Sequence, residues 1–176
     1  MSSNEIFQQN LTYGEEAEDI VYQYLIKNNS GVVDLRKQKR DENGGPRMVG
    51  TEGSFVLPDF GVYNKNPKKG TYSVDVKRKR SLYTYKAREC FTVDKKFEQY
   101  KKTSQIMGFN FVAIIFFYED RMYFYKDTDC IGFEYKVNDY GYGNIYYFPF
   151  DSQKLIYWSD KYCILTRLMK ITKLLS

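Results

Sequence analysis

The stretch at residues 58–80, PDFGVYNKNPKKGTYSVDVKRKR, decides how the fold of this chain is interpreted. Apolar residues alternate with polar or small ones on both sides of a turn-rich centre: Phe60 and Val62 precede it, and Val74 and Val76 follow it. A period of two is typical of strands with one apolar face. The pattern therefore predicts a hairpin that turns through residues 64–70.

Two carboxylates and a lysine fall at defined places on this hairpin. If the turn is symmetric about Pro67, Asp59 faces Asp75. Directly opposed residues hold their Cβ atoms about 4.5–5.5 Å apart, and two like charges at that distance are unfavourable unless a cation lies between them. Lys77 lies two residues beyond Asp75 and so points to the same face. The hairpin therefore predicts a metal site with a lysine beside it.

Pro58-Asp59, followed after fifteen residues by Asp75-Val76-Lys77, resembles the motif of the PD-(D/E)xK nuclease superfamily. This superfamily includes Holliday junction resolvases, restriction endonucleases and phage exonucleases. The acid-x-Lys triplet occurs three times, at residues 75–77, 94–96 and 134–136, but only the first follows Pro-Asp at hairpin distance. The resemblance implies an α/β fold with a restriction-endonuclease-like core, in which helices flank a central mixed β-sheet.

The resemblance also implies roles for individual residues. Asp59, Asp75 and the Val76 carbonyl would bind Mg²⁺ or Mn²⁺, and Lys77 would orient a water or stabilise developing charge. In the superfamily the first helix often carries a metal-binding glutamate, and residues 14–18 look like that segment. We therefore expect Glu18 to join the site, directly, through water or at a second metal position.

The composition suits one folded domain over residues 1–176. Apolar residues make up 43% and aromatic residues 18%, far above the level of a disordered chain. No apolar run approaches the roughly 18 residues that a membrane span needs, and residues 1–16 lack the pattern of a signal peptide. We expect a cytoplasmic protein, in the host cytoplasm if it is viral, and the abundance of Lys, Asn and Tyr suggests an AT-rich phage or mobile element.

The absence of histidine excludes much chemistry. Ser-His-Asp hydrolases, histidine-metal nucleases and histidine-ligated zinc deaminases all need imidazole. Cys90, Cys130 and Cys163 are isolated and odd in number, which favours reduced packing residues over disulfides, zinc or an iron–sulfur cluster. Carboxylate, lysine and tyrosine chemistry remains.

Basic residues surround the predicted hairpin, in clusters at 36–40, 65–69 and 77–80, within a formal net charge of +5. A basic rim around an acidic metal site suits a phosphodiester substrate, although such runs are equally common on ordinary solvated surfaces. Tyr83 and Tyr85, interleaved with basic residues, either stack on exposed bases or pack on the domain. The candidate DNA-binding residues are Lys79, Arg80, Lys86, Arg88 and, by weak analogy with the superfamily, Gln99.

The remaining segments predict elements around the hairpin. Thr12 to Glu15 form a capping-box pattern, so a helix is expected from there to a stop at residues 28–31. A second helix is expected over 95–107, a buried central strand over 111–117 and a hairpin partner over 121–125. Residues 132–150 are expected to add edge strands, and 160–175 a closing helix that serves either packing or a dimer contact.

The sequence thus favours a Mg²⁺-dependent deoxyribonuclease, in the first instance an endonuclease. A junction resolvase, which would act as a homodimer, and an exonuclease remain alternatives of the same fold. The rival from another class is a non-catalytic nucleic-acid-binding or inhibitory protein that keeps the fold and its basic surface.

Overall fold

The computed structural model describes residues 3–29, 31–37, 47–50, 53–64, 66, 70–138 and 141–158. Within these ranges two α-helices and twelve strands form a mixed α/β arrangement dominated by strands. The helices are α1 (Ser3–Asn28) and α2 (Lys96–Ile106). The strands are β1 (Gly31–Asp34), β2 (Arg47–Gly50), β3 (Gly53–Val56), β4 (Phe60–Tyr63), β5 (Thr71–Lys79), β6 (Tyr83–Tyr85), β7 (Arg88–Val93), β8 (Phe111–Tyr118), β9 (Arg121–Lys126), β10 (Gly132–Asn138), β11 (Gly141–Pro149) and β12 (Leu155–Trp158).

A six-stranded mixed sheet forms the centre of the molecule, in the order β1-β4-β5-β8-β9-β12. Strands β5 and β8 run parallel, and every other neighbouring pair in this sheet is antiparallel. The predicted hairpin is the β4–β5 pair, in which Phe60 lies opposite Val74 and Tyr63 opposite Thr71. The register expected from a turn centred at Pro67 is therefore confirmed.

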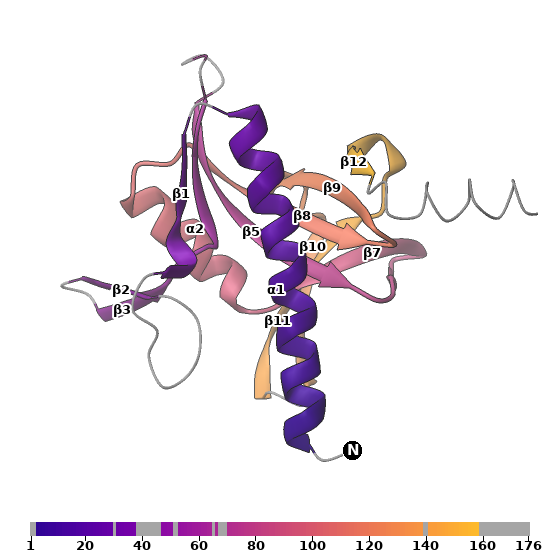
Figure 1. The fold of residues 1–176 in the computed structure, drawn as a ribbon. Coiled ribbons are helices and arrows are strands. Elements are labelled where there is room, and N and C mark those ends of the chain that lie inside the picture. Colours follow the sequence, from indigo (N-terminus) through magenta and orange to yellow (C-terminus); the bar gives the residue numbers. More distant parts are fainter. Residues whose placement is uncertain are drawn as a thin grey trace, which may run out of the picture.

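Helices α1 and α2 lie on opposite sides of the central sheet (Figure 1), and each face of the sheet is covered by its own hydrophobic core. On one face α1 packs its apolar stripe of Ala17, Val21 and Leu25 against Val74 and Val76 of β5. On the other face α2 and a second sheet pack against β8 and β9. Residues 112–117 of β8 are all buried because both faces are covered, as the continuous apolar run predicted.

Residues 132–150 form strands, as expected, but these belong to a second sheet in the order β10-β11-β7-β6. Strand β10 lies at one edge of this sheet, and β11 pairs with β10 and β7. Their aromatic residues explain this choice: Tyr146 and Phe148 pack against Phe97 of α2, with ring centroids 5.0 and 5.4 Å apart. Packing these rings against α2 removes more apolar surface from water than a place at an exposed sheet edge would.

Helix α1 begins earlier than predicted. It starts at Ser3, so Thr12 lies inside the helix rather than at its N-cap. Residues 3–11 contain neither Pro nor Gly, and nothing there prevents the helix from continuing upstream of the capping-box pattern. The predicted stop is confirmed, because the side-chain amides of Asn28 and Asn29 donate to the Tyr24 and Leu25 carbonyls at 2.7 and 2.9 Å.

Two further points concern the ends and the environment of the chain. The closing helix predicted at residues 160–175 lies outside the described residues. Neither α1 nor α2, as far as the structure describes them, is apolar enough over a sufficient length to cross a membrane.

Candidate active site

Asp59 and Asp75 meet where strand β4 begins. The β4–β5 ladder starts at Phe60 and Val74, and extending its register by one residue sets Asp59 opposite Asp75. The backbone N–H of Val76 donates to Asp59 Oδ2 at 2.7 Å, so the carboxylate accepts where a backbone carbonyl of a neighbouring strand otherwise would. Asp75 is only 1% exposed. The hairpin thus brings two carboxylates together at the edge of a buried strand.

Lys77 lies on the same face of β5 as Asp75, as the period of two predicted. Its ammonium is 2.7 Å from Asp75 Oδ2 and donates to the Tyr100 hydroxyl at 3.4 Å. Burial disfavours the charge on Lys77, but Asp75, Tyr100, Asp59 and Asp94 together outweigh this effect and raise the pKa of the lysine well above its usual range. Lys77 is therefore cationic at neutral pH and faces a buried carboxylate.

Glu18 approaches the same site from helix α1. Its carboxylate interacts electrostatically with Asp75 and Lys77, and its negative charge helps to raise the pKa of Asp59. Burial raises the pKa of Glu18, whereas Arg36 opposes that rise. The structure therefore brings the four predicted catalytic residues, Glu18, Asp59, Asp75 and Lys77, into one electrostatically coupled group.

Arg36, which the sequence interpretation treated only as part of a basic cluster, holds Glu18 in place. Its guanidinium is 3.4 Å from Glu18 Oε2, 2.9 Å from Asp19 Oδ1 and 3.0 Å from Asp34 Oδ1. The same group lies 4.8 Å from the ring centroid of Phe60, next in sequence to Asp59. A depression of about 270 Å³ opens here, lined by Glu15, Glu18, Asp19, Asp34, Arg36 and Lys37.

The carboxylates crowd negative charge into a protein interior. Burial raises the pKa of Asp59 well above its usual range, and the charges of Asp75 and Glu18 raise it further. Burial likewise raises the pKa of Asp75, against the opposing effect of Lys77. One lysine does not balance three carboxylates, and Arg36 is shared with Asp19 and Asp34. The group therefore favours an additional cation.

The chemistry of the donor atoms fits a hard divalent cation. Carboxylate and carbonyl oxygens are the ligands that Mg²⁺ and Mn²⁺ prefer. Asp75 Oδ2 is buried and, despite its close contact with Lys77, makes no hydrogen bond of acceptable geometry. Within the described residues no three Asp, Glu, Cys or His side chains are already grouped as metal ligands, so the carboxylates must move toward one another to share an ion.

Tyr100 and Asp94 also lie near the site, although neither was predicted to belong to it. The Tyr100 ring is buried, and its centroid lies 5.2 Å from Lys77 Nζ. Asp94, two residues before α2, accepts from the Lys96 N–H at 2.9 Å, and its charge also acts on Asp75 and Lys77. No local pattern at either position indicates which strand the side chain would meet.

The predicted DNA-binding residues divide into two groups. Lys79 lies beside the site, with Nζ 3.3 Å from Thr92 Oγ1; burial and the nearby Lys77 lower its pKa to about 8. Arg80 is exposed and lies 4.7 Å from the Tyr13 ring centroid on α1. Gln99 is exposed on α2, one residue before Tyr100.

The other two basic candidates belong to the second sheet. Lys86 and Arg88 are exposed at the β6–β7 turn, and Lys86 acts electrostatically on Glu134 of β10. Tyr85 is buried and stacks on Tyr147 with centroids 4.2 Å apart, which excludes it as a base-stacking residue in this conformation. Tyr83 remains 54% exposed.

Comparison with known protein families gave no matching family model, and comparison with curated proteins gave no significant match.

Proposed function

We propose that this chain is a metal-dependent DNA nuclease that hydrolyses phosphodiester bonds, acting as an endonuclease. The observation that carries the proposal is that the Asp59 carboxylate, just before β4, accepts from the Val76 N–H beside Asp75, with Lys77 2.7 Å from Asp75. Glu18 adds a third carboxylate from α1. An acidic group of this kind, deep in a chain of net positive charge, suits a divalent cation and a polyanionic substrate.

The metal site would be built from Asp59, Asp75, the Val76 carbonyl and Glu18. Mg²⁺ or Mn²⁺, when bound, would polarise the phosphate and lower the pKa of a bound water. Asp59 is positioned for this role by the Val76 N–H, which fixes one of its oxygens. Arg36 positions Glu18 and keeps part of its charge compensated until a cation arrives.

Lys77 would place a positive charge beside the reacting phosphate. Its ammonium is held by Asp75 and by the Tyr100 hydroxyl, so its direction is fixed before substrate binds. A preorganised cation stabilises charge that develops on phosphate oxygens, or orients the attacking water, whose oxygen accepts a hydrogen bond from an ammonium N–H. Lys79, two residues along the same face, supplies a second positive charge for the DNA backbone.

The order of elements supports a restriction-endonuclease-like core as part of the same proposal. The glutamate helix α1 comes first, followed by β1, β4 and β5 with the two aspartates and the lysine, then α2 and the buried strand β8. This is the order that the motif resemblance implied. We further propose that DNA is the partner, that the protein acts in the cytoplasm, and that a homodimer forms if the substrate is a four-way junction.

A substrate panel run with Mg²⁺, Mn²⁺ and EDTA tests the function. Closed circular plasmid, linear duplex, single strands and four-way junctions are incubated with wild-type protein and with Lys77→Ala, and Asp120→Asn serves as a control in the β8–β9 turn. Cleavage of closed circles that needs the metal and Lys77 supports an endonuclease. Cleavage from ends alone indicates an exonuclease, and preference for junctions indicates a resolvase.

The non-catalytic alternative gives a different result in the same panel. A protein that only binds nucleic acid would show salt-sensitive binding without metal dependence. No cleavage of any of the four substrates, together with binding that EDTA does not change, would contradict the nuclease proposal.

A further inference from the structure

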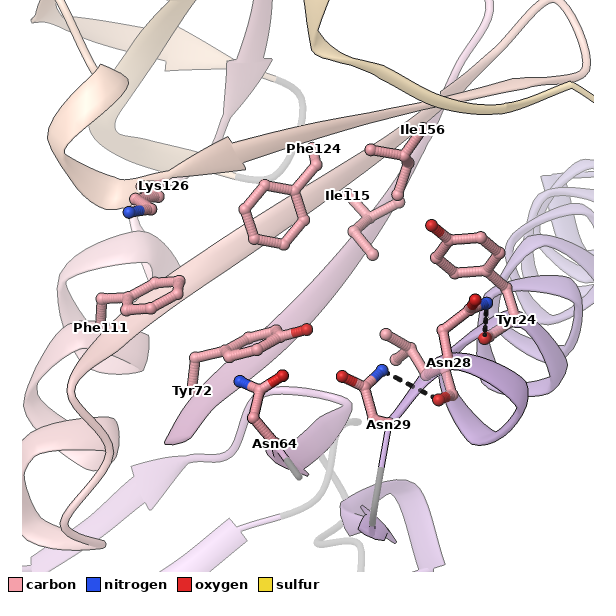
Figure 2. Close-up of a pocket in the computed structure, with 11 residues that line it drawn as sticks. Tyr24, Asn28, Asn29, Asn64, Tyr72, Phe111, Ile115, Phe124, Lys126 and Ile156 are labelled. Carbon is pink, nitrogen blue, oxygen red and sulfur yellow. Dashed lines mark hydrogen bonds between the residues drawn. The ribbon is translucent and has the colours of Figure 1, made fainter. Parts of the chain in front are cut away.

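A second cavity lies on the face of the central sheet that α1 covers, opposite the face to which Asp75 and Lys77 point (Figure 2). Along β5, Tyr72, Val74 and Val76 point toward the α1 core, whereas Ser73, Asp75 and Lys77 point toward α2. The cavity has a volume of about 460 Å³, within the usual range for small-molecule sites of about 300–1,000 Å³. It lies between the C-terminal end of α1 and strands β5, β8, β9 and β12, and is lined by Tyr24, Leu25, Asn28, Asn29, Asn64, Tyr72, Phe111, Ile115, Phe124, Lys126 and Ile156.

One wall of the cavity is aromatic and apolar. The Tyr72 and Phe111 rings stack with centroids 5.0 Å apart and planes 8° from parallel, and Phe124 meets Tyr72 edge-on at 5.9 Å. Ile115 and Ile156 continue this wall toward α1 in Figure 2. Such a wall suits an aromatic ligand better than a flexible chain, because aromatic rings pack edge-to-face or offset against one another and lose little conformational freedom on binding.

The opposite rim presents oriented polar groups. Asn29 donates its side-chain amide to the Leu25 carbonyl and Asn64 donates to the Gly70 carbonyl at 2.6 Å, and in each case the side-chain oxygen remains as an acceptor. Figure 2 shows the Asn29 oxygen and the Tyr72 hydroxyl pointing into the space between strands and helix. The cavity thus offers acceptors at positions fixed by backbone hydrogen bonds.

Tyr72 gives the second, independent indication of a ligand. The residue is 9% exposed, yet among the described residues its hydroxyl has no hydrogen-bond partner and points into the cavity. Burial, with a smaller effect from Tyr24, raises the pKa of Tyr72 to about 12, so the group is a neutral donor and acceptor at neutral pH. A hydroxyl that points into the cavity is free to exchange a hydrogen bond with a ligand.

The charge of the lining restricts the ligand further. Among the described lining residues Lys126 is the one basic side chain, and its Nζ lies 5.0 Å from the Phe111 ring centroid. None of these described residues carries a carboxylate. A ligand whose planar ring carries an amino group therefore matches the asparagine oxygens, and a negative group on the same ligand matches Lys126.

We propose that this cavity binds a purine nucleoside monophosphate, with the base against the Tyr72–Phe111 wall and the phosphate at Lys126. The base donates from its exocyclic amine to the Asn29 or Asn64 oxygen, and the Tyr72 hydroxyl completes the contact with a ring nitrogen. This site is separate from the proposed nuclease centre, and no step of phosphodiester cleavage depends on it.

Calorimetric titration of the full chain with adenosine 5′-monophosphate in EDTA tests the proposal without using any cleavage reaction. Wild type is expected to bind, and Tyr72→Phe, which keeps the ring stack but removes the hydroxyl, should weaken binding about fivefold, as the loss of one hydrogen bond does. Tyr63→Phe on β4 is the matched control, because this exposed residue lies on the other face. Lys77→Ala should leave the affinity unchanged.

Adenosine without phosphate tests the Lys126 assignment. It should bind several-fold more weakly than the monophosphate, and Lys126→Gln should remove that difference. Equal affinity for both ligands in wild type would overturn the placement of the phosphate. Failure of wild type to bind the monophosphate, or a Tyr72→Phe affinity equal to wild type, would overturn the site itself, whatever the outcome of the cleavage panel.

Discussion

Replacing Asp59 by asparagine should stabilise the metal-free protein while abolishing its response to Mg²⁺. Asparagine keeps an oxygen that accepts from the Val76 N–H, whose bond to Asp59 measures 2.7 Å, but carries no charge. The wild-type carboxyl has a strongly raised pKa, because burial and the charges of Asp75 and Glu18 disfavour its ionised form. The substitution therefore removes an unfavourable charge and retains the hydrogen bond.

The sign and size of the effect follow from linkage. For a carboxyl whose pKa is raised on folding, stability is highest below its ordinary pKa of about 4 and falls as pH rises toward the raised value. Each pH unit across that window costs wild type about 1.4 kcal/mol, which Asp59→Asn regains. For a chain of this size, one such unit corresponds to about 3–6 °C in melting temperature.

Thermal unfolding from pH 4 to 8 in EDTA measures this directly. The Asp59→Asn melting temperature should exceed that of wild type by a margin that grows with pH, and adding Mg²⁺ should raise the wild-type value only. Asp120→Asn should match wild type throughout, because asparagine tolerates the left-handed φ of 56° at that turn. A variant less stable than wild type at pH 7, or one that Mg²⁺ stabilises equally, would refute the charge-crowding argument.

Three further predictions concern the surroundings of the site. Arg36→Lys should lower stability by about 1–2 kcal/mol in denaturant titrations, because lysine cannot reproduce the planar guanidinium against Phe60 or its contact with Glu18. The same variant should need a higher Mg²⁺ concentration for half-maximal cleavage. An unchanged Mg²⁺ requirement would show that Arg36 does not position Glu18. Gly61→Ala should cost about 1–3 kcal/mol, because a Cβ there would lie 2.6 Å from Phe109 Cζ, and adding Phe109→Leu should restore part of the loss; no recovery in the double variant would contradict this cause. Lys79 is charged below its pKa of about 8, so DNA affinity of wild type should fall between pH 7 and 9 while Lys79→Arg keeps it, as measured by fluorescence anisotropy; parallel pH profiles would exclude Lys79 from the interface.

The local patterns predicted the part of the fold that surrounds the site. Alternation over residues 60–76 specified the β4–β5 hairpin and its register, because a slip of one residue would have turned Val74 and Val76 away from the α1 core. The same alternation placed Asp75 and Lys77 on one face. The apolar run of β8 identified the strand buried on both sides.

Longer-range features could not be predicted from the sequence because they depend on contacts between distant segments. Tyr146 and Phe148 join β11 to a separate sheet through contacts with Phe97, which no pattern within residues 132–150 records. Arg36 looked like one member of a basic run, whereas its ion pairs reach α1, eighteen residues earlier in the chain. The capping-box pattern at Thr12 is compatible with the start of a helix, but α1 extends upstream of it to Ser3.

The central claim is that Asp59, Asp75, Lys77 and Glu18 form a metal-dependent hydrolytic site, and plasmid cleavage by matched variants tests it most directly. Supercoiled plasmid is incubated with purified wild type, Asp75→Ala and Asp120→Asn in Mg²⁺ and in EDTA, after each variant has been shown to be folded. Wild type and Asp120→Asn should cleave the plasmid in Mg²⁺ but not in EDTA, and Asp75→Ala should lose at least about a hundredfold in cleavage rate. Undiminished Mg²⁺-dependent cleavage by Asp75→Ala would contradict the claim.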